Sequence, residues 1–168
     1  NPAPFPAPPG AREHMIEVSG ARLWCWDSGG RGMPILLLHP ATGSAAIWEY
    51  QYAPLVAAGF RVAAFSRRGH YRSEFTQGAD AGEAVADIEA VGKALSFNRF
   101  VVLGCAGGGF VVPDFALSYP EKLAGIVIAC SQGGAIDPAY RATISRGLPP
   151  GFAQQPASFR GVGASYRA

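Results

Sequence analysis

The sequence predicts an α/β fold in which a mostly parallel sheet carries helices on both faces. Short apolar runs, in which polar residues do not alternate with apolar ones, alternate along the chain with segments of helical periodicity. This is the pattern of buried parallel strands joined by crossover helices. The chain has 168 residues, of which 49% are hydrophobic and 15% are charged, the balance of one packed domain. In such sheets ligands bind beyond the carboxyl ends of the strands, so functional residues are expected there.

The start of the chain predicts a tail followed by an antiparallel hairpin. Residues 1–10 hold five prolines, which remove backbone donors and favour extended chain, so we interpret them as a proline-rich tail. Residues 15–18 and 22–27 are rich in strand-forming side chains and flank Ser19 and Gly20, a turn signal.

Strands and helices are then expected in alternation. The predicted buried strands are residues 34–39, 61–66, 100–105 and 123–130. The predicted helices are residues 46–58, 81–96 and 107–118. Gly59 ends the first of these helices, and Pro120 stops the last.

Residues 11–132 are therefore predicted to form the N-terminal part of a core, and residues 133–168 the start of a cap over it. The last segment is rich in glycine, proline and serine and contains no further buried strand. The strand at 123–130 is apolar on both faces, and nothing after it in the sequence covers its open edge. We expect a C-terminal segment absent from this sequence to complete the fold, and residues 1–168 alone to aggregate.

Several classes of function are disfavoured by composition. A net charge of +2 is too small for a nucleic-acid footprint, and no apolar stretch reaches the length that spans a membrane. Cys25, Cys105 and Cys130 are odd in number and lack metal-ligand spacing, so we expect buried free thiols. The predicted location is the cytoplasm. Because the chain begins at Asn1, a removed export signal stays an alternative.

The sharpest motif spans residues 101–110, where a buried strand passes through a glycine-dense turn into a helix. Gly104 and Gly108 stand two positions on either side of Ala106. This arrangement resembles the nucleophile elbow of the α/β-hydrolase superfamily, Gly-x-Ser-x-Gly, with alanine where the serine belongs. A nucleophile at such an apex needs tiny neighbours, and the resemblance implies that the amide of Gly107 faces the developing oxyanion.

Two further blocks agree in order and spacing with that family. Residues 38–43 resemble its His-Gly oxyanion loop, with Pro40 in place of the glycine. Because proline has no amide hydrogen, the resemblance implies Ala41 as the second oxyanion donor. Residues 65–73 resemble the Asp-x-Arg-Gly-x-Gly-x-Ser loop, with Ser66 in place of the aspartate. The resemblance covers roughly residues 15–132.

The alanine at position 106 implies that the chain as written is inactive, because a methyl group cannot attack a carbonyl carbon. We favour an engineered Ser→Ala change, since the rest of the motif is intact. The open alternatives are a naturally inactive hydrolase reused as a binding protein and a nucleophile shifted to Cys105, whose thiolate is a competent nucleophile.

The rest of a catalytic triad is incomplete in this sequence. The family order is nucleophile, acid and histidine, yet no histidine follows Ala106. His39 is interpreted as a loop anchor, His70 as a group at the pocket edge and His14 as incidental. Asp137, just beyond the strand at 123–130, is a candidate acid.

The resemblance implies hydrolysis of a carboxylic ester or lactone of a mainly apolar small molecule by a Ser-His-Asp mechanism without metal or organic cofactor. The alternatives are a catalytically dead binding protein and a C–C bond hydrolase of the same fold. The expected partners are the small-molecule substrate and the C-terminal remainder of the polypeptide, which would carry the histidine and the acid. The predicted substrate-pocket residues are His39, Pro40, Cys105, Trp48, Phe152 and Phe159.

Overall fold

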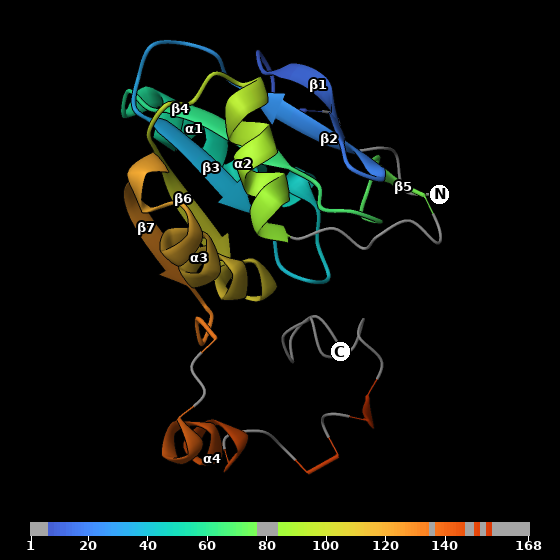
Figure 1. Ribbon diagram of the computed structural model, residues 1–168, viewed down its shortest axis with the longest axis vertical. Coiled ribbons are helices and arrows are strands. Elements are labelled where there is room, and N and C mark those ends of the chain that lie inside the picture. The colour runs from blue at the N-terminus through green and yellow to red at the C-terminus, as the bar shows by residue number, and fades with distance from the viewer. Residues whose placement is uncertain (1–6, 77–83, 135–136, 147–149, 152–153, 156–168) are drawn as a thin grey trace. The chain divides into compact units, whose positions relative to one another are not determined.

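The computed structural model describes residues 7–76, 84–134, 137–146, 150–151 and 154–155 (Figure 1). It divides the chain into two units, residues 1–133 and residues 134–168. The first unit contains the sheet and its covering helices. In the second unit the described helix is α4 (Pro138–Arg146).

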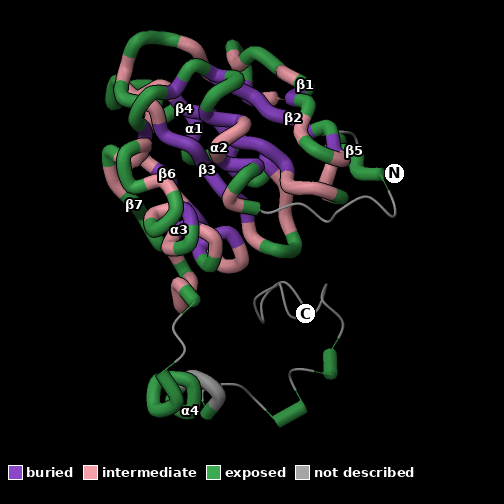
Figure 2. Tube along the Cα trace, viewed as in Figure 1, coloured by how far each residue is buried: buried purple, intermediate pink, exposed green. Residues whose placement is uncertain are grey.

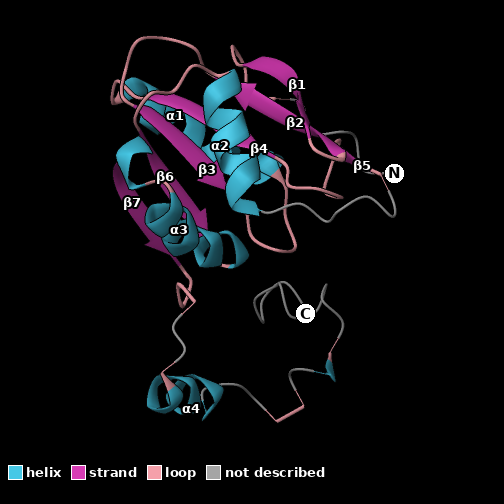
Figure 3. Cartoon of the chain, viewed as in Figure 1, coloured by secondary structure: helices cyan, strands magenta, loops and turns pink. Residues whose placement is uncertain are grey.

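The first unit is built on a mixed, mostly parallel sheet of seven strands (Figure 3). Its order is β1-β2-β4-β3-β6-β7, and β5 pairs with β2 beside that path. Strands β4, β3, β6 and β7 run parallel, whereas β1, β2 and β5 join by antiparallel pairs. The strands are β1 (Arg12–Val18), β2 (Ala21–Asp27), β3 (Pro34–Leu38), β4 (Arg61–Phe65), β5 (Glu74–Phe75), β6 (Phe100–Cys105) and β7 (Leu123–Ala129). The fold class predicted from the sequence is thereby confirmed.

Helices cover both faces of the sheet (Figure 1). Helices α2 (Ala84–Ala94) and α3 (Gly107–Ser118) pack on one face, whereas η1 (Ala45–Trp48) and α1 (Glu49–Ala57) pack on the other. A short turn of helix, η2 (Pro120–Lys122), leads into β7.

The central strands are buried on both sides, which explains their unbroken apolar sequence. In β3, Leu36 and Leu38 join the core under α2 and α3. Ile35 and Leu37 join the core under α1, together with Trp48. Successive side chains of a strand point to opposite faces, so one short strand serves both cores.

Strand β7 lies at the end of the sheet and is the least covered of the parallel strands (Figure 2). Ile126, Val127 and Ile128 are 46%, 43% and 39% exposed, although their side chains alternate between the two faces. The sheet therefore ends in an apolar strand whose described strand partner is β6 alone. Its completion by a further segment stays a prediction.

Some details differ from the sequence-based expectation. The helix expected from residue 46 begins as the 3₁₀ turn η1, and β5 and α4 were not expected. Cys130 is exposed and Cys105 is half-buried, so the prediction of buried thiols is correct for Cys25 alone. Cys130 follows the uncovered edge strand, which is why its apolar sequence context does not bury it. Among the described residues, no helix has both the length and the apolar character needed to cross a bilayer.

Candidate active site

Four parallel strands end at one edge of the sheet, and the loops that follow them meet there. Neighbouring β4, β3, β6 and β7 lead respectively into Ser66, His39, Ala106 and Cys130. The carboxyl ends of parallel strands lie side by side, so three of the sequence blocks singled out above come together.

The turn between β6 and α3 places Ala106 in a backbone conformation that non-glycine residues rarely adopt. Its φ is 48° and its ψ is −110°. The Ala106 N–H donates to the carbonyl of Ala129 at 2.9 Å, and its carbonyl accepts the Gly109 N–H at 3.0 Å. The turn is thus held from both sides, which is how a strained apex residue is maintained.

Glycines surround this turn because other backbone segments pass within contact distance. A Cβ atom on Gly104 would lie 2.5 Å from the carbonyl oxygen of Gly108. A Cβ on Gly108 would lie 2.4 Å from the carbonyl oxygen of Leu38 in β3. Any larger residue would push α3 away from β6 or β3, so these glycines allow the sharp bend.

The loop after β3 reaches the first residue of α3. The position that a Cβ would take on Gly107 is 2.8 Å from the backbone nitrogen of Ala41 and 2.9 Å from its Cβ. Ala41 belongs to a turn closed by the Gly43 N–H, which donates to the carbonyl of Pro40 at 3.0 Å. The backbone nitrogen of Ala41 therefore lies close to Gly107, the residue that follows the apex, and helix N-terminal amides favour negative charge.

His39 is a fully buried side chain with both ring nitrogens engaged. Nδ1 lies 2.7 Å from the carbonyl oxygen of Pro40, and Nε2 accepts the backbone N–H of Arg67 at 3.0 Å. A carbonyl can only accept, so Nδ1 carries the proton. Burial lowers the His39 pKa from 6.5 to about 4, and the nearby charges of Arg67 and His70 act in the same direction. The imidazole is neutral at pH 7, and it ties the loop after β3 to the loop after β4.

The loop after β4 braces the same segment through two more side chains. Buried Ser66 accepts the Ala45 N–H through Oγ at 3.2 Å. His70 Nδ1 lies 2.9 Å from the carbonyl of Gly43, to which it donates. Ser66 thus accepts a hydrogen bond from a backbone amide of the segment after β3. In the family motif that residues 65–73 resemble, an aspartate stands at this position.

Three arginines follow β4, and the structure gives them different surroundings. Arg68 forms a partly buried ion pair with Asp87 of α2 at 2.8 Å, and Arg72 pairs with Glu13 at 2.6 Å. Nε and Nη2 of Arg67 are buried, and the described part of the chain offers them no hydrogen-bond partner; burial lowers the pKa of the Arg67 guanidinium. Arg68 and Arg72 brace the loop through these ion pairs.

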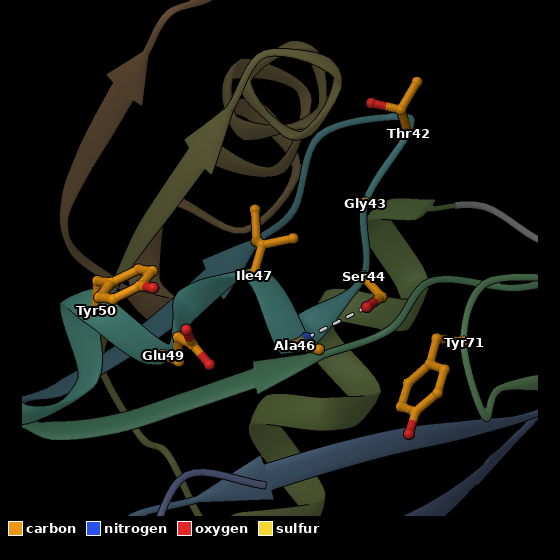
Figure 4. Close-up of a pocket in the computed structure, with 8 residues that line it drawn as sticks. All are labelled: Thr42, Gly43, Ser44, Ala46, Ile47, Glu49, Tyr50 and Tyr71. Carbon is orange, nitrogen blue, oxygen red and sulfur yellow. Dashed lines mark hydrogen bonds between the residues drawn. The ribbon is translucent and has the colours of Figure 1, made fainter. Parts of the chain in front are cut away.

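A largely apolar pocket of about 430 Å³ opens beside the loop after β3 (Figure 4). Ile47 and Tyr50 stand on one side of it and Tyr71, from the loop after β4, on the other. Its lining residues are Thr42, Gly43, Ser44, Ala46, Ile47, Glu49, Tyr50 and Tyr71. Most of these were missed because they come from an irregular loop and a 3₁₀ turn. The signal that could have found them is their position directly after the predicted oxyanion loop.

The predicted pocket residues occupy varied positions. Trp48 and His39 are buried and do not line this pocket; Trp48 packs in the core under α1. Pro40 and Cys105 are half-buried beside the turn at residue 106. Phe152 and Phe159 lie outside the described residues.

Asp137, the candidate acid, belongs to the second unit of the chain. There its Oδ1 accepts the Tyr140 N–H at 2.7 Å, which is the hydrogen bond of a helix N-cap. This carboxylate therefore caps α4 in the structure. A role as the catalytic acid stays a prediction.

Comparison with known protein families identifies the family of this chain. The family described as having the alpha/beta hydrolase fold matches residues 33–163, most of the chain. The chain belongs to the α/β-hydrolase fold family. The chain spans 37% to 45% of the length of the curated relatives it matches.

The names of the proteins that this chain resembles denote different activities. A bifunctional esterase/perhydrolase of Acinetobacter calcoaceticus is 29% identical over 139 residues, covering 82% of this chain and 45% of the relative. A solved N-acyl homoserine lactone degrading enzyme superimposes with a TM-score of 0.65 at 28% identity, covering 84% of this chain and 51% of the other. Epoxide hydrolase A of Mycobacterium thermoresistibile also gives a TM-score of 0.65 at 28% identity, covering 70% and 38%.

Proposed function

We propose that this α/β-hydrolase is the scaffold of a serine-type hydrolase of a carboxylic ester or lactone, with position 106 as the nucleophile position. The observation that carries the proposal is the backbone of Ala106, with φ 48° and ψ −110°, followed by Gly107, which the backbone of Ala41 approaches closely. A side chain at this apex stands clear of the strand and the helix that flank it, where a substrate carbonyl can approach.

With serine at position 106, the reaction follows from the two neighbouring amides. The serine Oγ attacks the ester carbonyl carbon while its proton passes to a histidine base. The N–H groups of Gly107 and Ala41 donate to the oxyanion that forms, and each such donor is worth about 10²–10³ in rate. The alkoxide leaves with the proton held by the histidine, and water then hydrolyses the acyl-enzyme by the reverse sequence of proton transfers.

The chain as written lacks this reaction because Ala106 has no oxygen or sulfur to attack with. We assign the catalytic histidine and the acid to a C-terminal remainder of the polypeptide, with Asp137 as a further candidate for the acid. Two facts support this assignment. The sequence has no histidine after His70. The matched relatives are more than twice as long as the matched region.

The pocket beside the loop after β3 supports this substrate class. Its walls include Ile47, Tyr50 and Tyr71, and the carboxyl-bearing residue in its lining is Glu49. Such a wall suits an uncharged, mainly apolar acyl or alcohol group. The similarity to a lactone-degrading enzyme and to an esterase supports this choice of bond over the C–C bond alternative.

The competing function is a binding protein that uses the same pocket without catalysis. It is separated from the hydrolase by Ala106→Ser in the protein with its full C-terminal sequence, assayed with short aryl esters. A burst of released alcohol equal to the enzyme concentration, absent from the Ala106 parent, is the expected result. A folded Ala106→Ser protein that binds the ester but never releases the alcohol supports the binding protein instead.

A further inference from the structure

Two cysteines meet at the end of the sheet directly beside the turn at residue 106. Cys105 is the last residue of β6 and pairs in register with Ala129, so Cys130 follows immediately on the neighbouring strand. Both thiols are free, and Cys130 is close enough to Cys105 to raise the pKa of its thiol. Cys130 has a φ of 50°, which turns the chain away from the ideal strand path just after β7.

The two thiols differ in accessibility. Cys130 is exposed, whereas Cys105 is half-buried and packs against the core under α1. Burial, and secondarily Cys130 itself, raises the pKa of the Cys105 thiol. An accessible cysteine next to a second cysteine that can resolve its sulfenic acid is the arrangement found in cysteine pairs that are oxidised reversibly.

We propose that Cys105 and Cys130 form a reversible disulfide, a modification site for peroxides at the base of the turn that carries position 106. The Cys130 thiolate attacks one oxygen of hydrogen peroxide, and the O–O bond breaks. Hydroxide departs, and Cys130 becomes a sulfenic acid. The Cys105 sulfur then attacks the Cys130 sulfur, the S–O bond breaks, and the departing hydroxide takes the Cys105 thiol proton and leaves as water. In sum, two thiols and one peroxide give one disulfide and two waters.

The disulfide would act on the turn through the residues next to it. Cys105 immediately precedes Ala106, whose N–H is held by the carbonyl of Ala129, the residue before Cys130. A covalent bond between the two cysteines therefore ties the end of β7 to the residue that begins the turn. This inference concerns the sulfur chemistry of the pair and is independent of the proposed hydrolase function.

The experiment exposes the protein to hydrogen peroxide and maps its thiols by non-reducing tryptic digestion and mass spectrometry. The three cysteines fall on three separate tryptic peptides, residues 23–31, 100–122 and 123–141. The expected product has lost about 2 Da, links the second and third peptides, and returns to the dithiol with dithiothreitol. Cys25, which is fully buried, serves as the internal control and stays reduced.

Cys130→Ser supplies the matched variant, in which peroxide should form no intramolecular link. If the parent protein instead accumulates sulfinic or sulfonic acid on Cys130 while Cys105 remains a free thiol, the proposal is wrong. A link that joins two protein molecules, or one that includes Cys25, overturns it equally. The parent measurement decides the question even if the variant does not fold.

Discussion

The backbone N–H of Arg67 donates to Nε2 of the buried His39 imidazole at 3.0 Å, joining two loops that are 28 residues apart in the sequence. The other ring nitrogen donates to the carbonyl of Pro40. Both nitrogens of His39 are therefore occupied, and the ring is 0% exposed. This histidine holds the loop that carries Ala41 and is unavailable as a catalytic base.

The His39 imidazole should make the protein less stable in acid. Its pKa is about 4 when folded and 6.5 when unfolded, so the unfolded chain binds more protons between these values. The contribution of His39 to the free energy of unfolding is fully present above pH 6.5, and about 3 kcal/mol of it is lost as the pH drops to 4. Urea unfolding between pH 7 and pH 4 measures this loss. His39→Gln, which cannot titrate, should flatten the curve; an NMR pKa of His39 near 6.5 contradicts the account.

Ser66→Ala should destabilise the protein by about 1–3 kcal/mol, because it leaves the buried Ala45 N–H without an acceptor. Ser44→Ala is the control. Its Oγ accepts the Ala46 N–H at 3.3 Å in a half-buried position, where water can replace it. Chemical denaturation of both variants measures the difference. Equal effects would show that the Ser66 hydrogen bond does not hold the loop.

Gly108→Ala should lower the free energy of unfolding by roughly 1–3 kcal/mol or prevent folding, since its Cβ would meet the Leu38 carbonyl oxygen at 2.4 Å. Gly125→Ala tests the specificity of this effect. Gly125 lies in β7, and a Cβ added to it would have Cγ2 of Val101 in β6 as its nearest atom, at 3.8 Å, an ordinary contact. Thermal melting of the two variants should separate them widely, and similar melting temperatures would mean that β3 and α3 are not in close approach.

Asp87→Asn should cost about 1–3 kcal/mol of stability because it leaves the partly buried Arg68 guanidinium with a neutral partner. Glu74→Gln breaks the exposed pair with Arg22 and should change stability little. Urea denaturation at low and high salt compares them. A small effect of Asp87→Asn would show that water reaches the Arg68 guanidinium.

Much of the fold is predictable because local sequence and tertiary packing agree. The strands at residues 34–38 and 100–105 are apolar on both faces. In the structure each of these strands has only buried and half-buried residues. The turn at Ala106 is predictable from the spacing of its glycines, since only tiny residues allow the approach of β3.

The remainder depends on information that the local sequence does not contain. Strand β5 is Glu74–Phe75 alone, too short to show any periodicity. The described side chains of α4 are exposed, so the described part of this helix has no buried apolar face from which it could have been predicted. The hydrogen bond from Ala45 to Ser66 joins residues 21 apart, and the exposure of Cys130 depends on β7 lying at the edge of the sheet.

The most direct test of the account asks whether position 106 is a nucleophile position. The Ala106→Ser protein with its full C-terminal sequence is treated with a fluorophosphonate, which labels activated serines, and the Ala106 parent is the control. We predict one covalent adduct, mapped by fragmentation to residue 106 within the tryptic peptide of residues 100–122. A folded Ala106→Ser protein that stays unlabelled, or that is labelled at a different serine, would contradict the central claim.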